Sequence, residues 1–423
     1  MEPSQDPAMT HRLPILGGPL KGPTFAVWET TLRCNQACRF CGTRAGRARS
    51  DELDTREALD TVGQLAELGV REVAMHGGET YLRADWLEIV RAITARGMAA
   101  TMVTGGRGVT STLAQQAREA GLAAVSVSID GGEATHDSLR GIDTSHASAH
   151  RALEYFHQAG IPVGVNTQVN RQNLAELPEL FEEIRRHPLY GWQVQLMVPM
   201  GRAADEESLW LQPYDILELM PMLVALRYRA DQAGIALWPG DNVGYFGTFE
   251  SVLRRGRSRE GYSTGCGGGV IAIGIEANGD IKGCSAMASE GFVAGNVRQS
   301  SLRQLWDHAA ELKISREFSP ERLWGFCKTC YYAEVCKAGC VWTSATILGR
   351  YGNAPYCHHR ALEHLSRGLR ERLSRVELAP GTPRDHARFV IETEPAPADW
   401  ARRMRLANAV EAVGHDAQLV GNA

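Results

Sequence analysis

The placement of ten cysteines is the feature that most limits what this 423-residue chain can fold into. Three lie within eight residues near the N-terminus, the other seven follow residue 265, and residues 42–265 contain none. The positions are Cys34, Cys38, Cys41, Cys266, Cys284, Cys327, Cys330, Cys336, Cys340 and Cys357. The N-terminus lacks the apolar core of a secretory signal, so we expect a cytoplasmic protein whose clustered cysteines bind metal rather than form disulfides.

Composition argues against two classes of partner. The 45 Lys and Arg residues nearly balance the 49 Asp and Glu residues, which gives no electrostatic case for a nucleic acid partner. No run of about 18 apolar residues occurs, so we expect no transmembrane helix and no membrane partner. The hydrophobic share of 44% and the charged share of 22% are those of an ordinary globular protein.

The cysteine-free body alternates strand-like and helix-like segments. Strand patterns are expected at residues 25–30, 70–76, 98–104, 122–130, 161–169 and 192–200. Helix patterns are expected at residues 55–69, 86–97, 111–120, 148–159, 175–186 and 213–234, with Asp85 as N-cap of the second. This alternation predicts an α/β fold with a parallel sheet, and six units are fewer than a closed barrel needs. We therefore expect a partial (β/α)6 TIM-like barrel with its chemistry at the carboxyl ends of the strands.

Cys34, Cys38 and Cys41 lie at the end of the first expected strand. Their spacing lets three thiolates converge, and thiolates are the usual ligands of iron–sulfur clusters. A 4Fe–4S cube normally takes four cysteines, so three leave one iron open to a substrate or cosubstrate. The competing interpretation is a zinc site completed by a histidine, although no histidine lies between His11 and His76.

These cysteines, with Phe40 before the last of them, resemble the CxxxCxφC motif of the radical S-adenosylmethionine (radical SAM) superfamily. The resemblance implies a 4Fe–4S cluster on Cys34, Cys38 and Cys41 whose open iron chelates S-adenosylmethionine, with Phe40 beside the cosubstrate. It also implies reductive cleavage of S-adenosylmethionine to a 5′-deoxyadenosyl radical, which abstracts hydrogen from the substrate. We expect an electron donor of the flavodoxin or ferredoxin type as the partner for that reduction.

Gly77-Gly78-Glu79 follows the second expected strand and resembles the GGE motif of the same superfamily. The resemblance implies contact with the amino group of the cosubstrate. The residue types agree with this role, since glycines allow close approach of the backbone and a carboxylate pairs with an ammonium group. His76, just before the motif, is expected either to touch the substrate or to be a hydrogen-bonded structural histidine.

Ser128 and Asp130 end the fourth expected strand. With Arg140 they resemble the SxDG…HD…RG segment of the superfamily, in which the serine contacts the ribose and the arginine contacts the carboxylate of the cosubstrate. A helix N-cap turn is the competing interpretation of Ser128 and Asp130. We also expect Tyr81, Arg107, Gln195 and Met197, near strand ends, to line the cavity or pack the barrel.

The seven C-terminal cysteines resemble the SPASM extension, a module that carries auxiliary 4Fe–4S clusters in one branch of radical SAM enzymes. A zinc ribbon built from CxxC pairs is the alternative. The resemblance implies two auxiliary clusters, one on Cys266, Cys284 and Cys340 and one on Cys327, Cys330, Cys336 and Cys357, which makes three clusters in all. Because the first auxiliary set has three cysteines, we expect its fourth position to meet a substrate atom, water or a protein side chain. Asn278-Gly279 predicts a β-hairpin turn inside the module.

The resemblance leaves more than one reaction open. We favour a peptide maturase that abstracts hydrogen from a precursor peptide and leaves a cross-link, ring or unsaturation. The alternative is a dehydrogenase or rearrangement enzyme that acts on a small molecule. A sulfatase maturase is disfavoured, because Ser285 stands where those enzymes have an aspartate. A non-enzymatic iron–sulfur carrier is also disfavoured, because it would have no need of the GGE and SxDG residues.

These expectations divide the chain into four parts. They are an N-terminal extension (1–23), the radical SAM partial barrel (24–234), the SPASM domain (235–375) and a C-terminal extension (376–423). The last part contains a possible helix over residues 398–413. The substrate, the acid or base residues and the role of this extension are not readable from the sequence.

Overall fold

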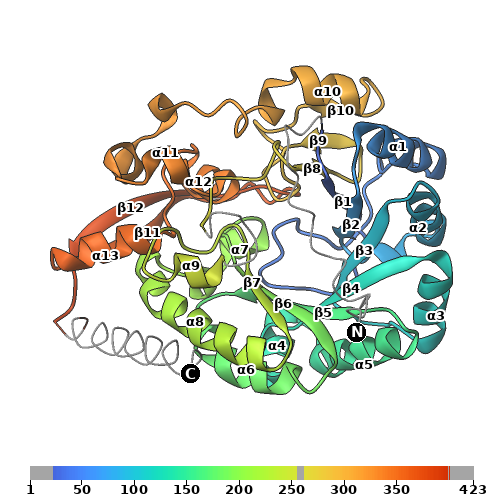
Figure 1. The fold of residues 1–423 in the computed structure, drawn as a ribbon, viewed down its shortest axis with the longest axis horizontal. Helices are drawn as coiled ribbons and strands as arrows, with labels where there is room; N and C mark the ends of the chain where they lie inside the picture. The colour runs from blue at the N-terminus through green and yellow to red at the C-terminus, as the bar shows by residue number, and fades with distance from the viewer. Residues whose placement is uncertain (1–21, 255–261, 399, 401–423) are drawn as a thin grey trace, which may run out of the picture.

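A parallel sheet forms the centre of the molecule (Figure 1), in a computed structural model that describes residues 22–254, 262–398 and 400. Its first seven strands are β1 (Phe25–Thr31), β2 (Glu72–Gly77), β3 (Ala99–Thr104), β4 (Leu122–Ser128), β5 (Val163–Val169), β6 (Leu189–Leu196) and β7 (Ala236–Pro239). Each pairs with the next in parallel. All six expected strands form, and the predicted α/β fold class is confirmed. The four-residue β7 extends the sheet by one strand beyond β6.

Most helices of the barrel lie on the outer side of this sheet (Figure 1), whereas the short helix after β6 lies beside the cysteine loop. Those of the barrel are α1 (Thr55–Leu68), α2 (Trp86–Ala95), α3 (Ser111–Ala120), α4 (Glu133–Arg140), α5 (Ser145–Gln158), α6 (Leu177–Ile184), α7 (Arg202–Asp205) and α8 (Ile216–Gln232). In α1 the side chains of Ala58, Val62 and Leu65 are buried, which is why the apolar spacing predicted this helix. Gly69 ends α1 with φ of 96°, a conformation that favours glycine.

Asp85 occupies the predicted N-cap position of α2, but the capping hydrogen bond that the prediction implies is not formed. The carboxylate instead accepts hydrogen bonds from Arg83, at 2.6 Å from Nε and 2.8 Å from Nη2. A charged, two-point pair is stronger than a single bond to a backbone N–H, so the nearby guanidinium takes this carboxylate.

The C-terminal module continues the same sheet past β1. Its strands are β8 (Ala272–Ile275), β9 (Asp280–Lys282) and β10 (Gly295–Asn296), and β8 pairs with β1 in parallel. β8 and β9 are antiparallel, with Asn278 and Gly279 between them and φ of 87° at Gly279, so the predicted hairpin turn is confirmed. The helices of this part are α9 (Glu250–Leu253), α10 (Leu302–His308), α11 (Ala333–Cys336), α12 (Val341–Leu348) and α13 (His358–Ser366).

The C-terminal extension forms a β-hairpin of β11 (Leu369–Glu377) and β12 (Arg388–Pro395). Its connecting loop carries Arg384, whose side chain is 2% exposed and forms an ion pair with Glu29 of β1. The loop therefore reaches the barrel interior from far along the chain. The helix expected over 398–413 lies, apart from residues 398 and 400, outside the described residues. Among the described helices, none is long and apolar enough to cross a membrane.

Candidate active site and metal centres

The loop after β1 brings Cys34, Cys38 and Cys41 together. Burial raises the pKa of Cys34 to about 12, and the nearby Glu79, Cys38 and Cys41 act in the same direction. Burial likewise raises the pKa of Cys38 to about 11. The three thiols therefore lie within electrostatic range of one another, as the sequence predicts for ligands of a single cluster.

Hydrogen-bond donors surround the three sulfur atoms. The backbone N–H of Gln36 donates to Cys34 Sγ and that of Ala45 to Cys41 Sγ, each at 3.4 Å. Arg140 Nη1 donates to Cys38 Sγ at 3.7 Å. Such donors stabilise thiolate sulfur and tune the potential of an iron–sulfur cluster.

Hydrogen bonds from the loop that follows β3 hold the cysteine loop in place. Asn35 Nδ2 donates to Arg107 O at 2.7 Å, and Arg107 Nη1 donates in return to Asn35 O. Tyr81 OH donates to the same Arg107 carbonyl at 2.5 Å. Tyr81 and Arg107, which the sequence offered as cavity residues, thus brace the loop, and Met197, 1% exposed, packs in the core.

The glycines of the GGE segment are required by close contact with the chain after β1. Gly78 N donates to Thr31 O at 2.7 Å, and Glu79 N donates to Arg33 O at 2.8 Å. A Cβ atom on Gly78 would lie 2.1 Å from Arg33 O, and one on Gly77, whose φ is 130°, would lie 2.4 Å from Thr31 O. Any other residue here would separate Glu79 from the cysteine loop.

Glu79 is a buried carboxylate that accepts three hydrogen bonds and, among the described residues, has one acceptor position unused. Its side chain accepts hydrogen bonds from Thr104 Oγ1 at 2.6 Å, Gly105 N at 2.8 Å and Gln36 Nε2 at 3.3 Å. Burial raises its pKa to about 7. A carboxylate offers about four acceptor positions, so one remains for a cationic group such as an ammonium. The residue therefore fits the cosubstrate role that the resemblance implies.

Asp130 is fully buried at the end of β4 and forms an ion pair with Arg140 at the end of α4. Its Oδ2 accepts from Arg140 Nε at 2.8 Å, and its Oδ1 accepts from Gln168 N at 2.9 Å. The N-cap of α4 is Gly132, so Asp130 does not cap this helix. The N-cap interpretation of Asp130 is therefore wrong, and the side chain positions Arg140 instead.

Arg140 links this ion pair to the cysteine loop. Its guanidinium lies 5.1 Å from the centre of the Phe40 ring and donates to Cys38 Sγ. Ala37 N and Arg39 N donate to the carbonyls of Arg140 and Leu139, respectively, at 3.2 and 2.9 Å. Ser128 ends β4 and pairs in register with Asn166 of β5. The three sequence motifs thus meet at one edge of the sheet, at the carboxyl ends of β1, β2 and β4.

The remaining cysteines form two further groups. Cys266 and Cys340 share a side-chain hydrogen bond, and Cys266 lies near enough to Cys284 to raise its pKa, together with burial, to about 11. Burial raises the pKa of Cys357 to about 12, with Cys327 and Cys330 acting in the same direction. Cys336 lies near all three of these thiols. The groups have the composition expected for the two auxiliary clusters.

The four-cysteine group has an apolar surround. Its thiols line a small cavity together with Phe246, Phe326, Tyr332, Ala333, Ala338, Ala354 and His359. An all-sulfur donor set in an apolar setting fits an iron–sulfur cluster. Tyr332 N donates to Cys330 Sγ at 3.4 Å, which adds the kind of donor that such clusters use.

A larger cavity of about 520 Å³ lies beside the group of Cys266, Cys284 and Cys340, and Cys266 forms part of its wall. Four basic side chains line it, against the one carboxylate of Asp241: Arg254, Arg316, Arg322 and Lys337. A volume of this size is that of a ligand site, and its charge favours an anion.

Comparison with protein families agrees with this geometry. Residues 28–184 match the radical SAM superfamily, and residues 266–331 match the iron–sulfur cluster-binding domain called SPASM. An AdoMet-dependent heme synthase of Oleidesulfovibrio alaskensis is 30% identical over 79% of this chain and 86% of its own length. This chain belongs to the radical SAM superfamily. It carries a SPASM domain after the barrel, so S-adenosylmethionine and iron–sulfur clusters are its cofactors.

A second curated protein and two solved structures are also similar to this chain. The mycofactocin maturase MftC of Mycolicibacterium smegmatis is 28% identical over 76% of this radical SAM chain and 79% of its own length. The fold is similar to that of Streptococcus suis SuiB bound to S-adenosylmethionine, with a TM-score of 0.62 at 16% identity over 80% and 77% of the two chains. SuiB is also known bound to its precursor peptide SuiA, a structure with a TM-score of 0.60, 16% identity and coverage of 76% and 72%.

Sequence reasoning missed the residues that hold the site from a distance. Arg384 reaches Glu29 across 355 positions, and Asn35 pairs with Arg107 across 72. Because the partners in each pair are so far apart in the sequence, no pattern of neighbouring residues predicts that they meet. His76, at the end of β2, has a buried Nε2 without a hydrogen-bond partner among the described residues, and burial, with Arg384 and Lys282, lowers its pKa to about 3.

Proposed function

We propose that this chain is a radical SAM oxidoreductase that modifies a ribosomally made precursor peptide, leaving a cross-link, ring or unsaturation. The observation that carries the proposal is the basic cavity of about 520 Å³ beside Cys266. This cavity would hold an acidic peptide segment beside the group of Cys266, Cys284 and Cys340. The likeness to a mycofactocin maturase and to the fold of a peptide-bound SuiB supports a peptide partner.

In this proposal the chain holds three 4Fe–4S clusters. Cys34, Cys38 and Cys41 would hold the first, Cys266, Cys284 and Cys340 the second, and Cys327, Cys330, Cys336 and Cys357 the third. A flavodoxin- or ferredoxin-type donor would reduce the first cluster, and the reducing cytoplasm would keep the thiols available. With its cofactors bound, the first site supplies hydrogen-atom abstraction from the substrate.

The residues around the first site bind and orient the cosubstrate. Glu79 would accept the ammonium group of S-adenosylmethionine at its free acceptor position. Ser128 and Arg140 would contact the ribose and the carboxylate, with Asp130 holding Arg140 in place. Gly77 and Gly78 keep the GGE backbone against the cysteine loop, and Phe40 stacks on Arg140. These contacts would fix the orientation of the cosubstrate at the first site.

The oxidation needs an acceptor for a second electron. Abstraction removes one hydrogen atom from a substrate carbon, and formation of a cross-link, ring or double bond releases one further electron and one proton. Because Cys266 lines the cavity, a substrate there would lie beside the second cluster, which would take that electron. The fourth position of this cluster would also be open to a substrate heteroatom.

A small-molecule substrate is the second candidate, and two observations favour it. The relative at 30% identity is a heme synthase, and a basic cavity of this volume would also suit a small molecule with several carboxylates. In this case the enzyme would be a dehydrogenase or rearrangement enzyme with the same cluster chemistry.

Cosubstrate cleavage is the first test. Anaerobically reconstituted protein, incubated with S-adenosylmethionine and dithionite, should form 5′-deoxyadenosine. Changing Cys34, Cys38 and Cys41 together to Ala should abolish this product while iron remains at the other two sites. Continued cleavage in this variant would show that the cosubstrate site is elsewhere.

Coexpression separates the two substrate classes. The protein should be coexpressed anaerobically with each short open reading frame beside its gene, and the peptides weighed by mass spectrometry. A peptide that loses two hydrogen atoms per event supports the maturase. Unchanged masses for all of these peptides, together with turnover of a polycarboxylate from a neighbouring biosynthetic step, would favour the small-molecule enzyme.

A further inference from the structure

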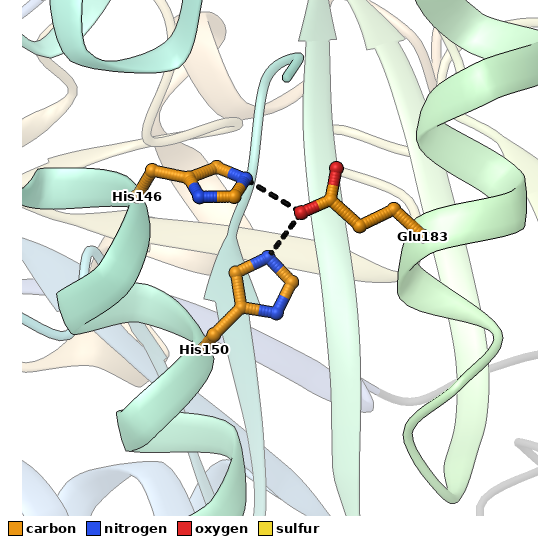
Figure 2. Close-up of side chains that lie close together, drawn as sticks. All are labelled: His146, His150 and Glu183. Carbon is orange, nitrogen blue, oxygen red and sulfur yellow. Dashed lines mark ion pairs between the residues drawn. The ribbon is translucent and has the colours of Figure 1, made fainter. Parts of the chain in front are cut away.

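We propose that His146, His150 and Glu183 form a site for a divalent zinc-type cation between two helices on the outer side of the barrel, separate from the cysteine groups. His146 and His150 lie on α5, and Glu183 lies in the last turn of α6 (Figure 2). The ion would join two neighbouring helices of the barrel wall. This inference stands independently of the proposed function.

The three side chains converge on one point. His146 Nε2 lies 2.8 Å from Glu183 Oε1, and His150 Nε2 lies 3.0 Å from the same oxygen. The three ligand atoms all lie within 4.8 Å of one another. In a tetrahedral site with bonds of about 2.0–2.1 Å, ligand atoms lie about 3.3 Å apart. The two nitrogen–oxygen distances therefore need to open by only about 0.3–0.5 Å to reach this value.

Helix geometry explains why two imidazoles face the same carboxylate. Residues four positions apart lie on one face of a helix, which is the spacing by which paired histidines bind zinc. Asp137 fixes the start of α5, since its side chain accepts hydrogen bonds from Thr144 N and His146 N, each at 2.7 Å. The histidine pair therefore has a defined position relative to α6.

Ordinary hydrogen bonding does not account for these imidazoles. His146 Nε2 and His150 Nε2 are buried and, within the described part of the chain, neither makes a hydrogen bond, although both lie close to Glu183. A cation between the two nitrogens and the carboxylate would satisfy all three groups.

His187 supplies the support that a metal-binding imidazole needs. Its Nε2 lies 2.8 Å from His150 Nδ1. When Nδ1 of His150 donates this hydrogen bond, its Nε2 carries the lone pair that faces Glu183. Metal-bound histidines commonly donate their second ring N–H in this way. Two imidazoles and one carboxylate suit zinc rather than calcium or magnesium, which prefer oxygen ligands.

Zinc retention by the cluster-loaded full chain tests the site. The reconstituted protein should be incubated anaerobically with Zn²⁺, desalted and analysed for zinc and iron. We expect about one zinc per chain in the wild type, and loss of most of it in His150→Gln and Glu183→Gln. Glu179→Gln, an exposed position one turn earlier on α6, is the matched control and should keep the zinc. Iron content and circular dichroism should be unchanged in all variants.

X-ray absorption at the zinc edge distinguishes this site from the cysteines. Zinc on His146, His150 and Glu183 should show nitrogen and oxygen neighbours at about 2.0–2.1 Å, whereas zinc on cysteine should show sulfur at about 2.3 Å. A sulfur shell, no retained zinc, or equal zinc in Glu183→Gln and the wild type would each overturn the proposal. If His150→Gln fails to fold, the half-exposed Glu183 still provides the test.

Discussion

Asp130 and Arg140 form the buried ion pair that joins the end of β4 to the cysteine loop. The exposed fractions of their side chains are 0% and 9%. Arg140 in turn contacts Cys38 Sγ and the Phe40 ring. A buried guanidinium without its carboxylate is costly, because no water can replace the lost partner. The position of the loop that carries three candidate cluster ligands therefore depends on a single carboxylate.

Replacement of this carboxylate should be strongly destabilising. We expect Asp130→Asn to lower the free energy of unfolding by about 3–5 kcal/mol, because the amide leaves Arg140 buried without a counter-charge. Anaerobic denaturant unfolding of the cluster-loaded protein measures the change. Glu133→Gln, at an exposed position on the same helix, is the control and should stay within about 0.5 kcal/mol of the wild type. Equal stability of the two variants would contradict the role given to Asp130.

The motif residues were predictable to different degrees. The grouping of Cys34, Cys38 and Cys41 follows from their close spacing, whereas the two C-terminal groups were implied only by the resemblance to the SPASM module. The role of Asp130 was not readable, since a carboxylate after a strand predicts an N-cap as well as an ion pair. Tyr81 and Arg107 were placed at strand ends correctly, but their hydrogen bonds to the cysteine loop depend on side-chain directions that a sequence does not specify.

At the scale of elements, the loop of the β11–β12 hairpin contacts both the barrel and the cysteine-rich module where the two meet. Arg384, in its loop, forms an ion pair with Glu29 of β1 and lies 3.7 Å from Glu276, which follows β8. Its Nη1 also donates to the carbonyl of Ser285. One side chain thus neutralises carboxylates from both parts of the sheet, so the hairpin stabilises their junction.

Loss of Arg384 should therefore weaken the junction. We expect Arg384→Met to cost about 3–5 kcal/mol, because Glu29 is fully buried and would lose its cationic partner. The matched control is Arg388→Met in the same hairpin, whose ion pair with Glu377 has exposed fractions of 61% and 56%. An exposed pair contributes about 0–1 kcal/mol, so this variant should resemble the wild type. Similar unfolding midpoints for both variants would show that the hairpin does not stabilise the junction between the barrel and the cysteine-rich module.

The elements of the barrel were more predictable than the hairpin. The six strands and six of the helices within residues 25–232 follow from apolar periodicity, because each packs against the same core. The short helices α4 and α7 were not predicted. The strands β11 and β12 are largely charged and exposed, so no such period marks them. Helix α5 begins at Ser145 rather than at the expected residue 148, and this difference kept His146 outside the predicted helix and hid its pairing with His150.

At the scale of the whole molecule, the sheet is continuous from β10 to β7, so β8, β9 and β10 of the cysteine-rich module belong to the same sheet as the barrel strands. Folding of the cysteine-rich module is therefore coupled to folding of the barrel. The buried histidines are part of the same cooperative unit. His136 is fully buried, accepts a hydrogen bond from Asp130 N at 3.1 Å, and lies 3.3 Å from Ser145 Oγ through Nε2.

His136 should make the stability of the whole chain sensitive to mild acid. Burial, with the charge of Arg140 and the neighbouring histidines, lowers its pKa from 6.5 to about 2. Below about pH 6.5 the unfolded chain takes up a proton that the folded chain does not, so stability is lost as the pH falls. One such proton corresponds to about 1.4 kcal/mol per pH unit. The free energy of unfolding should be measured from about pH 7.5 to about pH 5.5. In His136→Asn its slope against pH should correspond to about one fewer proton taken up on unfolding than in the wild type. Asparagine is chosen because its amide oxygen can still accept the hydrogen bond from Asp130 N. His308→Asn, at an exposed position on α10, should keep the wild-type slope, and an equal slope in His136→Asn would mean that His136 takes up its proton in the folded protein.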